Sequence, residues 1–213
     1  MQKKISMVQC ILTVVFVAAL LISNIVASRT LSFPFGITMS GGAYIFPLTY
    51  ILSDLFSEVY GYRWSRITCY LAFAMNLFMV AIFTLVIKTP SVDTIAAQQA
   101  FSLVLGNTPR LLVASLTAFV VGDFVNDKVF AIMKRKHNDH TGFGTRAIAS
   151  SILGTLIDTT VWTLIAFFGT INIATVISII VSEIISKTLY EIAILPITTK
   201  VVHYVSRYEN NIQ

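Results

Sequence analysis

The sequence predicts an all-α integral membrane protein with six transmembrane helices. The chain is 56% hydrophobic and only 12% charged, whereas an ordinary soluble domain is about 25% charged. Its apolar residues form several blocks of roughly 20 residues, the length that an α-helix needs to cross a bilayer. The basic residues fall between these blocks, as in the loops of polytopic membrane proteins. These features predict a single transmembrane domain over residues 1–213.

The spans are expected at residues 5–27, 44–61, 66–88, 110–133, 147–168 and 172–200. The first has an apolar run of about 22 residues, longer than the 7–15 of a signal peptide, so we expect it to be retained as a span. The second is interrupted by Pro47, and the sixth contains Glu183, Lys187 and Glu191. A hydropathy profile alone would rank these two low as transmembrane spans, although their polar residues are the most informative about function.

The connections between the spans differ in character. Residues 29–43 carry one proline and three glycines, which favours turns over regular helix. Residues 89–109 contain two prolines and predict a short interfacial helix between them. Residues 134–146 form the most polar stretch. We considered His137 and His140 there as metal ligands but favour a solvated, positively charged hairpin, so no metal and no cofactor is expected.

Orientation follows from the basic residues. A cytoplasmic N-terminus leaves only Arg29, Lys88 and Arg110 outside, and six spans then place the C-terminus in the cytoplasm too. The net charge of +5 is therefore a feature of topology and not of nucleic-acid binding. Cys10 and Cys69 each fall in an apolar block without metal or disulfide spacing, so we expect both to be buried and reduced.

The predicted spans contain many acids and one base. A charged side chain at the bilayer centre costs about 2.5–3.5 kcal/mol on insertion scales, so such groups should face one another or a hydrated cavity. The embedded acids are Asp54, Glu58, Asp123, Asp127, Asp158, Glu183 and Glu191. Spacing of four residues puts several of them on a shared helix face. The sequence therefore predicts a polar cavity among the helices.

Structural roles stay open beside functional ones. Lys187, with Glu183 and Glu191 one turn before and after it, could form a neutralising ladder that lowers insertion cost, or its amine could donate to a bound solute. Asn24 and Asn76 could join helices by hydrogen bonds or contact a ligand.

The pair Asp54 and Glu58 also has two interpretations. The two carboxylates lie one helical turn apart, so they share a face. That face could line a solute path near the cytoplasmic end. Alternatively, the pair could extend towards the nearby Arg63 and Arg66 at the membrane surface.

Two stretches resemble a known family. FPLTYILSDLFSEVYGYRWSR (46–66) resembles the signature of the queuosine precursor transporters, once labelled vitamin uptake transporters, and SSILGTLIDTTVWTLIAF (150–167) is similar to that family's fifth span. The acid-plus-lysine last span, 182–196, also fits. The resemblance implies a multi-pass importer in the bacterial inner membrane that salvages 7-cyano- or 7-aminomethyl-7-deazaguanine for the queuosine of tRNA.

The resemblance and the cavity together give the candidate site residues. Carried over by position, Asp54, Glu58, Asp158, Glu183 and Lys187 are expected to bind substrate. Asn76, Trp162 and Tyr190 join them as a hydrogen-bonding partner and aromatic walls. Membrane-embedded acids can also carry a coupling proton, a role assigned to Asp123, Asp127 and Glu191.

The chemistry of the expected substrate agrees with these residue types. A guanine-like ring offers adjacent N–H donors that a carboxylate can accept together, as acidic side chains do when they read base edges. Its carbonyl oxygen requires a donor such as Lys187 or Asn76. Its flat face suits an aromatic wall, since stacking on an aromatic side chain contributes about 1–3 kcal/mol per base.

Two other functions compete with this assignment. The chain could be the substrate-binding subunit of an energy-coupling vitamin importer, which would need ATPase partners. An intramembrane enzyme is disfavoured because the sequence has no HExxH metal pair and no GxSxG nucleophile elbow, so no catalytic residue is assigned. The expected partners are a deazaguanine, the lipid bilayer and, as one arrangement, a second copy of the chain in a homodimer.

Overall fold

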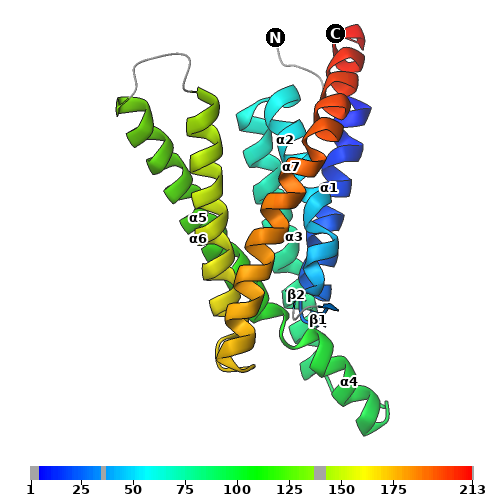
Figure 1. Cartoon of the computed structure of the whole chain (residues 1–213). Helices are drawn as coiled ribbons and strands as arrows, with labels where there is room; N and C mark the ends of the chain where they lie inside the picture. Colours follow the sequence, from blue (N-terminus) through cyan, green and yellow to red (C-terminus); the bar gives the residue numbers. More distant parts are fainter. Residues whose placement is uncertain (1–4, 35–36, 137–142, 213) are drawn as a thin grey trace. The chain divides into compact units, whose positions relative to one another are not determined.

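A computed structural model describes residues 5–34, 37–136 and 143–212, which are predominantly helical (Figure 1). In chain order the elements are α1 (Met7–Val26), β1 (Thr30–Ser32), β2 (Thr38–Ser40), η2 (Gly41–Tyr44), α2 (Phe46–Leu55), η3 (Phe56–Tyr60), α3 (Tyr62–Lys88), α4 (Ile95–Leu105), α5 (Thr108–Lys136), α6 (Phe143–Phe167) and α7 (Ile173–Ile212).

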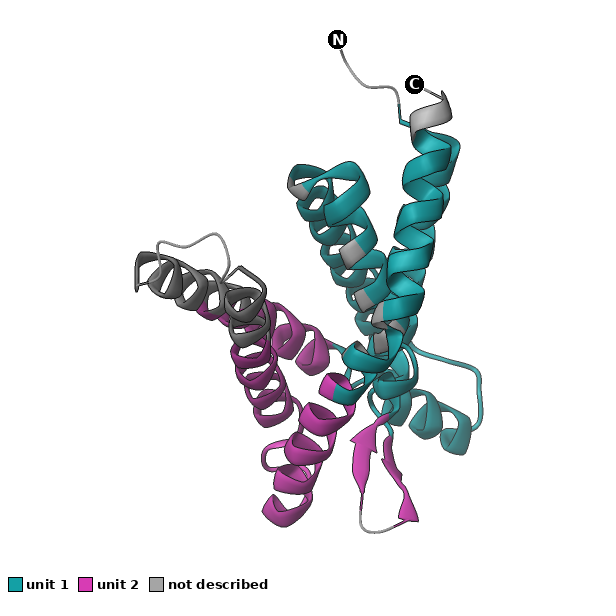
Figure 2. Ribbon diagram, turned by 45° about the horizontal axis from the view of Figure 1, so that its top comes forward, with its two compact units in different colours: residues 1–29, 41–108, 189–213 teal, residues 30–40, 109–188 magenta. Residues whose placement is uncertain are grey.

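The chain divides into two compact units (Figure 2). Unit 1 comprises residues 1–29, 41–108 and 189–213, and unit 2 comprises residues 30–40 and 109–188. Unit 1 therefore holds α1 to α4 and the last part of α7. Unit 2 holds the two strands, nearly all of α5, α6 and the first part of α7.

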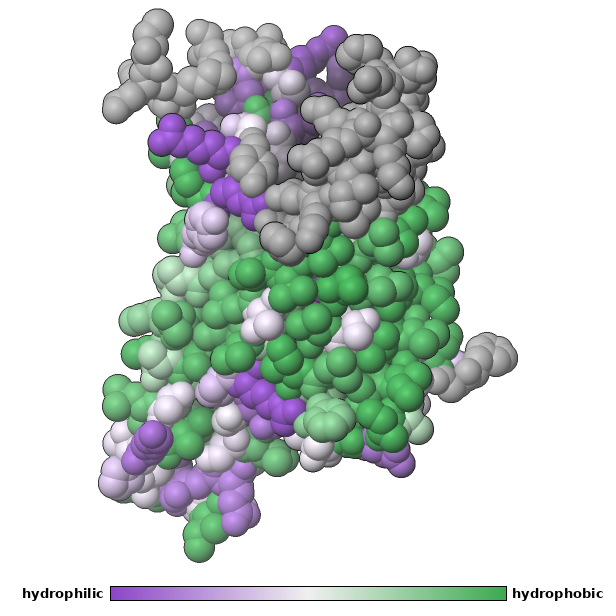
Figure 3. Space-filling model, turned by 90° about the vertical axis from the view of Figure 1, so that its left-hand side faces the viewer, coloured by the Kyte–Doolittle hydropathy of each residue, from purple (hydrophilic) through white to green (hydrophobic). Residues whose placement is uncertain are grey.

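The surface of the helices is that of a membrane protein. Within the described residues, four helical stretches are long and apolar enough to cross a bilayer, and a shorter apolar one covers Ile152–Phe167; the four are Met7–Val26, Arg63–Lys88, Ile95–Gly122 and Ile173–Ile194. Large apolar side chains are exposed along them, for example Val14, Leu85 and Leu189 at 62%, 64% and 62%, and they dominate the surface seen in Figure 3. Soluble proteins do not expose apolar surface on this scale.

The predicted second and sixth spans have different bounds in the structure. The single helix predicted over 44–61 is instead the ten-residue α2 followed by the π-helical turn η3. Gly61, at φ 82°, then caps the start of α3. The sixth continues to residue 212, because α7 has 40 residues. Forty residues are about twice the roughly 20 that a helix needs to cross a bilayer.

Unit 1 is organised around the packing of α1 against α2 and α3. A capping box starts α1, in which Ser6 Oγ accepts from the Gln9 N–H and the Gln9 side chain accepts from the Ser6 N–H. Phe16 meets Phe56 edge to face with ring centroids 5.9 Å apart, an arrangement that the ring quadrupoles favour. These rings pack with Leu52 and Ala72 into a core cluster.

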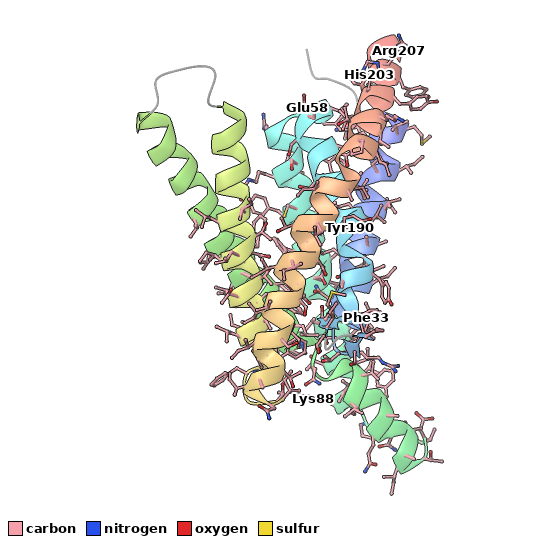
Figure 4. All side chains as sticks on the ribbon, viewed as in Figure 1. Phe33, Glu58, Lys88, Tyr190, His203 and Arg207 are labelled. Carbon is pink, nitrogen blue, oxygen red and sulfur yellow. The ribbon has the colours of Figure 1, made fainter. Side chains whose placement is uncertain are left out.

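The two ends of the chain meet at one end of unit 1. Glu209, near the end of α7, is buried and accepts hydrogen bonds from Ser6 Oγ at the start of α1 and from the Tyr60 hydroxyl of η3, the latter at 2.8 Å. Arg207 lies at this same end, and Lys88 lies at the opposite end (Figure 4). The start of α1 and the last turns of α7 are therefore on the same side of unit 1.

In unit 2, α5 and α6 are tied together at several points. Arg110 at the start of α5 donates from Nε to the Ile165 carbonyl at 2.6 Å and from a terminal nitrogen to the Phe168 carbonyl. It thus caps the C-terminus of α6, whose last carbonyls have no partner within the helix. This contact gives a structural reason for a basic residue at the predicted outer end. The Trp162 indole N–H of α6 donates to Ser115 Oγ of α5 at 3.2 Å.

Two predictions outside the site need correction. Within residues 29–43, where turns are predicted, β1 and β2 pair antiparallel in the register Thr30↔Ser40, Leu31↔Met39 and Ser32↔Thr38, so a small ribbon interrupts the all-α architecture. Cys10 is exposed on α1 and Cys69 is only partly buried on α3, so the expectation that both are buried is wrong. A membrane helix exposes apolar side chains to lipid, and an apolar sequence block therefore does not identify the buried face.

Candidate functional site

Four polar side chains of unit 2 come together between α6 and α7. We call Asp158, Thr159, Glu183 and Lys187 the Lys187 cluster. Lys187 Nζ donates to Thr159 Oγ1 at 2.9 Å and lies 3.8 Å from both Asp158 Oδ2 and Glu183 Oε2. The structure thus brings together three of the residues that the sequence predicts for substrate binding.

Helical periodicity places Glu183 in the cluster. On α7, Val176, Ile179 and Glu183 follow the spacing i, i+3, i+7 of a buried helix face, and the three are 1%, 0% and 1% exposed. A carboxylate therefore occupies a position where the preceding turns bury apolar side chains. Burial of an ion has an effective penalty of several kcal/mol, which needs compensation by partners.

A close approach of α5 to α6 positions Asp158. A Cβ atom on Gly122 of α5 would lie 3.0 Å from the Asp158 Cβ and 3.3 Å from the Gly154 carbonyl oxygen. Glycine at 122 therefore allows a close helix contact in which a Cβ atom would be crowded. Asp158 keeps 35% of its side chain exposed, whereas Lys187 keeps 9%, so Asp158 is the member of the cluster that a solute can reach most easily.

The cluster is incompletely satisfied. If all three groups are ionised, two carboxylates face one ammonium, and its 3.8 Å contacts with them exceed hydrogen-bond distance. Of the polar atoms that the structure describes in unit 2, Glu183 Oε2, Ser40 Oγ and Thr163 Oγ1 are buried without a hydrogen-bond partner. Each such group costs about 1–3 kcal/mol. A ligand that offers hydrogen-bond donors would remove part of this cost.

Asn76, a predicted binding residue, lies in unit 1 and is fully buried. Its Oδ1 accepts from the Asn24 Nδ2 at 2.6 Å, and its own Nδ2 donates to the Ala72 carbonyl at 3.0 Å. Both ends of the amide are thus occupied by α1 and by the preceding turn of α3. The contact matches the inter-helix alternative, and a substrate role for Asn76 stays a prediction.

The other described candidates lie in different surroundings. Trp162 follows Asp158 by one turn on α6, is 5% exposed, and packs edge to face on Phe167 at 5.6 Å. Glu58 is exposed on η3, at the end of unit 1 that also holds Arg207 (Figure 4). Tyr190 lies farther along α7 towards its middle and is 38% exposed. Their assignments as substrate contacts stay predictions.

Several predicted residues fall outside the described part of the chain. For Asp54, Asp123, Asp127 and Glu191 the structure describes the helical backbone but not the side chain, and His137 and His140 lie in the omitted segment 137–142. In the described part, no three or more His, Cys, Asp or Glu side chains gather in a way that could hold a metal ion.

Three buried polar residues of the structure were missed by sequence reasoning. Ser40 and Thr163 are short hydroxyl residues, and nothing in the linear pattern separates them from the other serines and threonines of the chain. Glu209 had a detectable signal, because it continues the i, i+7, i+11 stripe of Thr198 and Val205, all three of which are buried on α7.

Residues 40–201 match the family described as "Putative vitamin uptake transporter". A protein of Bacillus subtilis (strain 168) named "Probable queuosine precursor transporter" is 24% identical over 135 residues, which cover 63% of this chain and 59% of that relative. No solved structure matches the chain. The family match extends over well more than half of the chain and includes the whole Lys187 cluster; the chain belongs to this family of membrane transporters.

Proposed function

We propose that the chain imports 7-deazaguanine precursors of queuosine, in the 7-cyano or 7-aminomethyl form, across the bacterial inner membrane for salvage into tRNA. Family membership and the name of the Bacillus subtilis relative support the proposal. The single observation that carries it is the buried Glu183 carboxylate, which has one oxygen without a hydrogen-bond donor among the described residues, beside Lys187 and Asp158.

The Lys187 cluster offers the groups that such a ring requires. The pyrimidine edge of a 7-deazaguanine carries a ring N–H beside an exocyclic amine. The Glu183 carboxylate accepts on this edge, and the Asp158 carboxylate accepts from the outer hydrogen of the amine. Its carbonyl oxygen accepts from Lys187, whose ammonium has three donors. Trp162 provides an aromatic wall one turn from Asp158. This recognition excludes rings that lack the donors, because the buried carboxylate would then stay unpaired.

The remaining predicted residues complete the path. Asp54 and Glu58 line its cytoplasmic part, and Tyr190 is a second aromatic contact. Asn76 takes its structural alternative and holds α3 to α1. Asp123, Asp127 and Glu191 carry a coupling proton if import is proton-driven. A homodimer is one arrangement for the assembly.

The proposed topology has six spans with both termini in the cytoplasm. Two facts from unit 1 support it: Ser6 and Glu209 are in contact at one end, and Lys88 lies at the other. A membrane-impermeant maleimide added to intact cells should label Lys88→Cys and leave Arg207→Cys unlabelled, in a chain without Cys10 and Cys69. Labelling of Arg207→Cys would contradict the topology.

Transport by the purified chain tests the function. Proteoliposomes that contain only this protein should accumulate labelled 7-cyano-7-deazaguanine and exclude adenine and biotin. Comparing uptake before and after collapse of an imposed proton gradient distinguishes proton-driven from facilitated uptake. Binding without accumulation, with uptake restored by added ATPase subunits, would support the energy-coupling importer instead. Uptake of biotin in preference to the deazaguanine would contradict the proposed substrate.

A further inference from the structure

The β1–β2 ribbon of unit 2 lies along the polar face of α7. The Thr38 N–H donates to Ser182 Oγ at 3.4 Å, the Ser40 N–H donates to Glu183 Oε1 at 3.1 Å, and Ser186 Oγ donates to the Met39 sulfur at 3.1 Å. Three successive residues of β2 thus contact two consecutive turns of the helix. The ribbon is therefore fixed to the element that carries Glu183 and Lys187, and it is not merely a connection between spans.

Ser40 brings two polar groups to the Glu183 carboxylate. Its backbone N–H occupies Oε1 and so fixes the orientation of the carboxylate. Its hydroxyl is fully buried, and no described residue provides it with a hydrogen-bond partner; the same holds for Glu183 Oε2. Two buried oxygens without partners therefore belong to two residues that contact each other. Since most buried polar atoms in proteins are hydrogen-bonded, a pair of exceptions in one place needs a physical reason.

We propose that Ser40 is a substrate-binding residue that determines specificity together with Glu183. The ribbon holds Glu183 through the Ser40 backbone, which leaves Glu183 Oε2 and Ser40 Oγ to accept the two adjacent N–H donors on one edge of the bound heterocycle. The inference rests on the proposed function and adds to it the ribbon, from which sequence reasoning selected no residue.

This arrangement explains how the site separates related rings. A guanine-like edge presents a ring N–H and an exocyclic amine side by side, which matches two acceptors. Adenine presents a ring nitrogen acceptor beside its amine and would leave the carboxylate oxygen facing a lone pair. Sites that are built to hydrogen-bond a donor discriminate strongly against analogues without it, because their buried polar groups then stay unpaired.

The test compares Ser40→Ala with Ser32→Ala for two solutes. Ser32 lies on β1 of the same ribbon and is exposed, so it is the matched control. The solutes are 7-cyano-7-deazaguanine and its analogue without the exocyclic amine. Loss of one hydrogen bond corresponds to about a fivefold to tenfold effect. Ser40→Ala should raise the KM of the parent compound by this factor and leave the KM of the analogue unchanged, while Ser32→Ala changes neither.

The other outcomes separate the two proposals. Equal KM values for wild type and Ser40→Ala with both solutes would overturn the role of Ser40 and leave the proposed function intact. An equal rise for both solutes would also overturn it, because a purely structural serine weakens every solute alike. Absence of uptake by the wild type would overturn the proposed function and this inference with it. If Ser40→Ala is not inserted, Ser40→Cys, whose thiol is a weak hydrogen-bonding group, must give the same selective loss.

Discussion

The Asn24–Asn76 pair of unit 1 and the Lys187 cluster of unit 2 are both buried polar contacts between helices, but they are satisfied to different degrees. The Asn76 amide is neutral and has a partner at both ends. Lys187 lies 3.8 Å from each of two carboxylates, and Glu183 keeps one oxygen unpaired among the described atoms. The first arrangement serves helix packing. The second is costly to retain unless a ligand completes it.

The largest expected effect is on uptake through the Lys187 cluster. Asp158→Asn and Glu183→Gln preserve side-chain volume but remove the charge that accepts the ring donors. A hydrogen bond to a charged group contributes about 1.5–3 kcal/mol, so uptake should fall by about 10-fold to 100-fold while the amount of inserted protein stays unchanged. Uptake assays on membranes with matched protein levels measure this.

Asp93→Asn is the matched control, since Asp93 is exposed between α3 and α4. It should transport like the wild type. Full uptake by both cluster variants would refute their assignment to the site. Loss of both variants from the membrane would instead identify the cluster as structural, like the asparagine pair.

The second effect should appear in stability and not in transport. Asn76→Ala removes the acceptor of Asn24 and the donor to Ala72, which we expect to lower the free energy of unfolding by about 1–3 kcal/mol. The thermal midpoint of the purified protein should fall, and the KM should remain that of the wild type. Asn107→Ala, at an exposed position, is the matched control. A tenfold rise in KM at an unchanged midpoint would return Asn76 to the substrate site.

The smallest effect concerns the contact between the two chain ends in unit 1. Tyr60→Phe removes the hydroxyl that donates to Glu209 but leaves the Ser6 contact in place. The free energy of unfolding should fall by about 0.5–1.5 kcal/mol. Tyr204→Phe, at a residue that is 74% exposed, should have no effect. Equal thermal midpoints for the two variants would mean that the Glu209 contact contributes nothing measurable.

Features that depend on local periodicity could be predicted from the sequence. Glu183 and Lys187 are four residues apart on one helix, so their ion pair follows from helix geometry. The short helix α4 between two prolines was expected as well, and residues 95–105 confirm it. The family was identified from two motifs, and the match over residues 40–201 confirms it.

Features that depend on contacts between distant segments could not be predicted. Thr159 meets Lys187 only because α6 packs on α7, and Ser40 meets Glu183 only because a ribbon forms 143 residues earlier in the chain. The glycines and proline of residues 29–43 predict turns, whereas the pairing of β1 with β2 is a contact that local propensity does not predict. The partner of Asn76 was one of two alternatives, and periodicity does not distinguish an inter-helix contact from a ligand contact.

Equilibrium binding of 7-cyano-7-deazaguanine to purified wild type, Glu183→Gln and Asn76→Ala most directly tests the claim that the incomplete cluster, and not the satisfied pair, holds the solute. Wild type and Asn76→Ala should bind with the same affinity, and Glu183→Gln should bind at least about tenfold more weakly, with no binding of adenine. Wild-type affinity in Glu183→Gln, or a loss of affinity in Asn76→Ala alone, would contradict the claim.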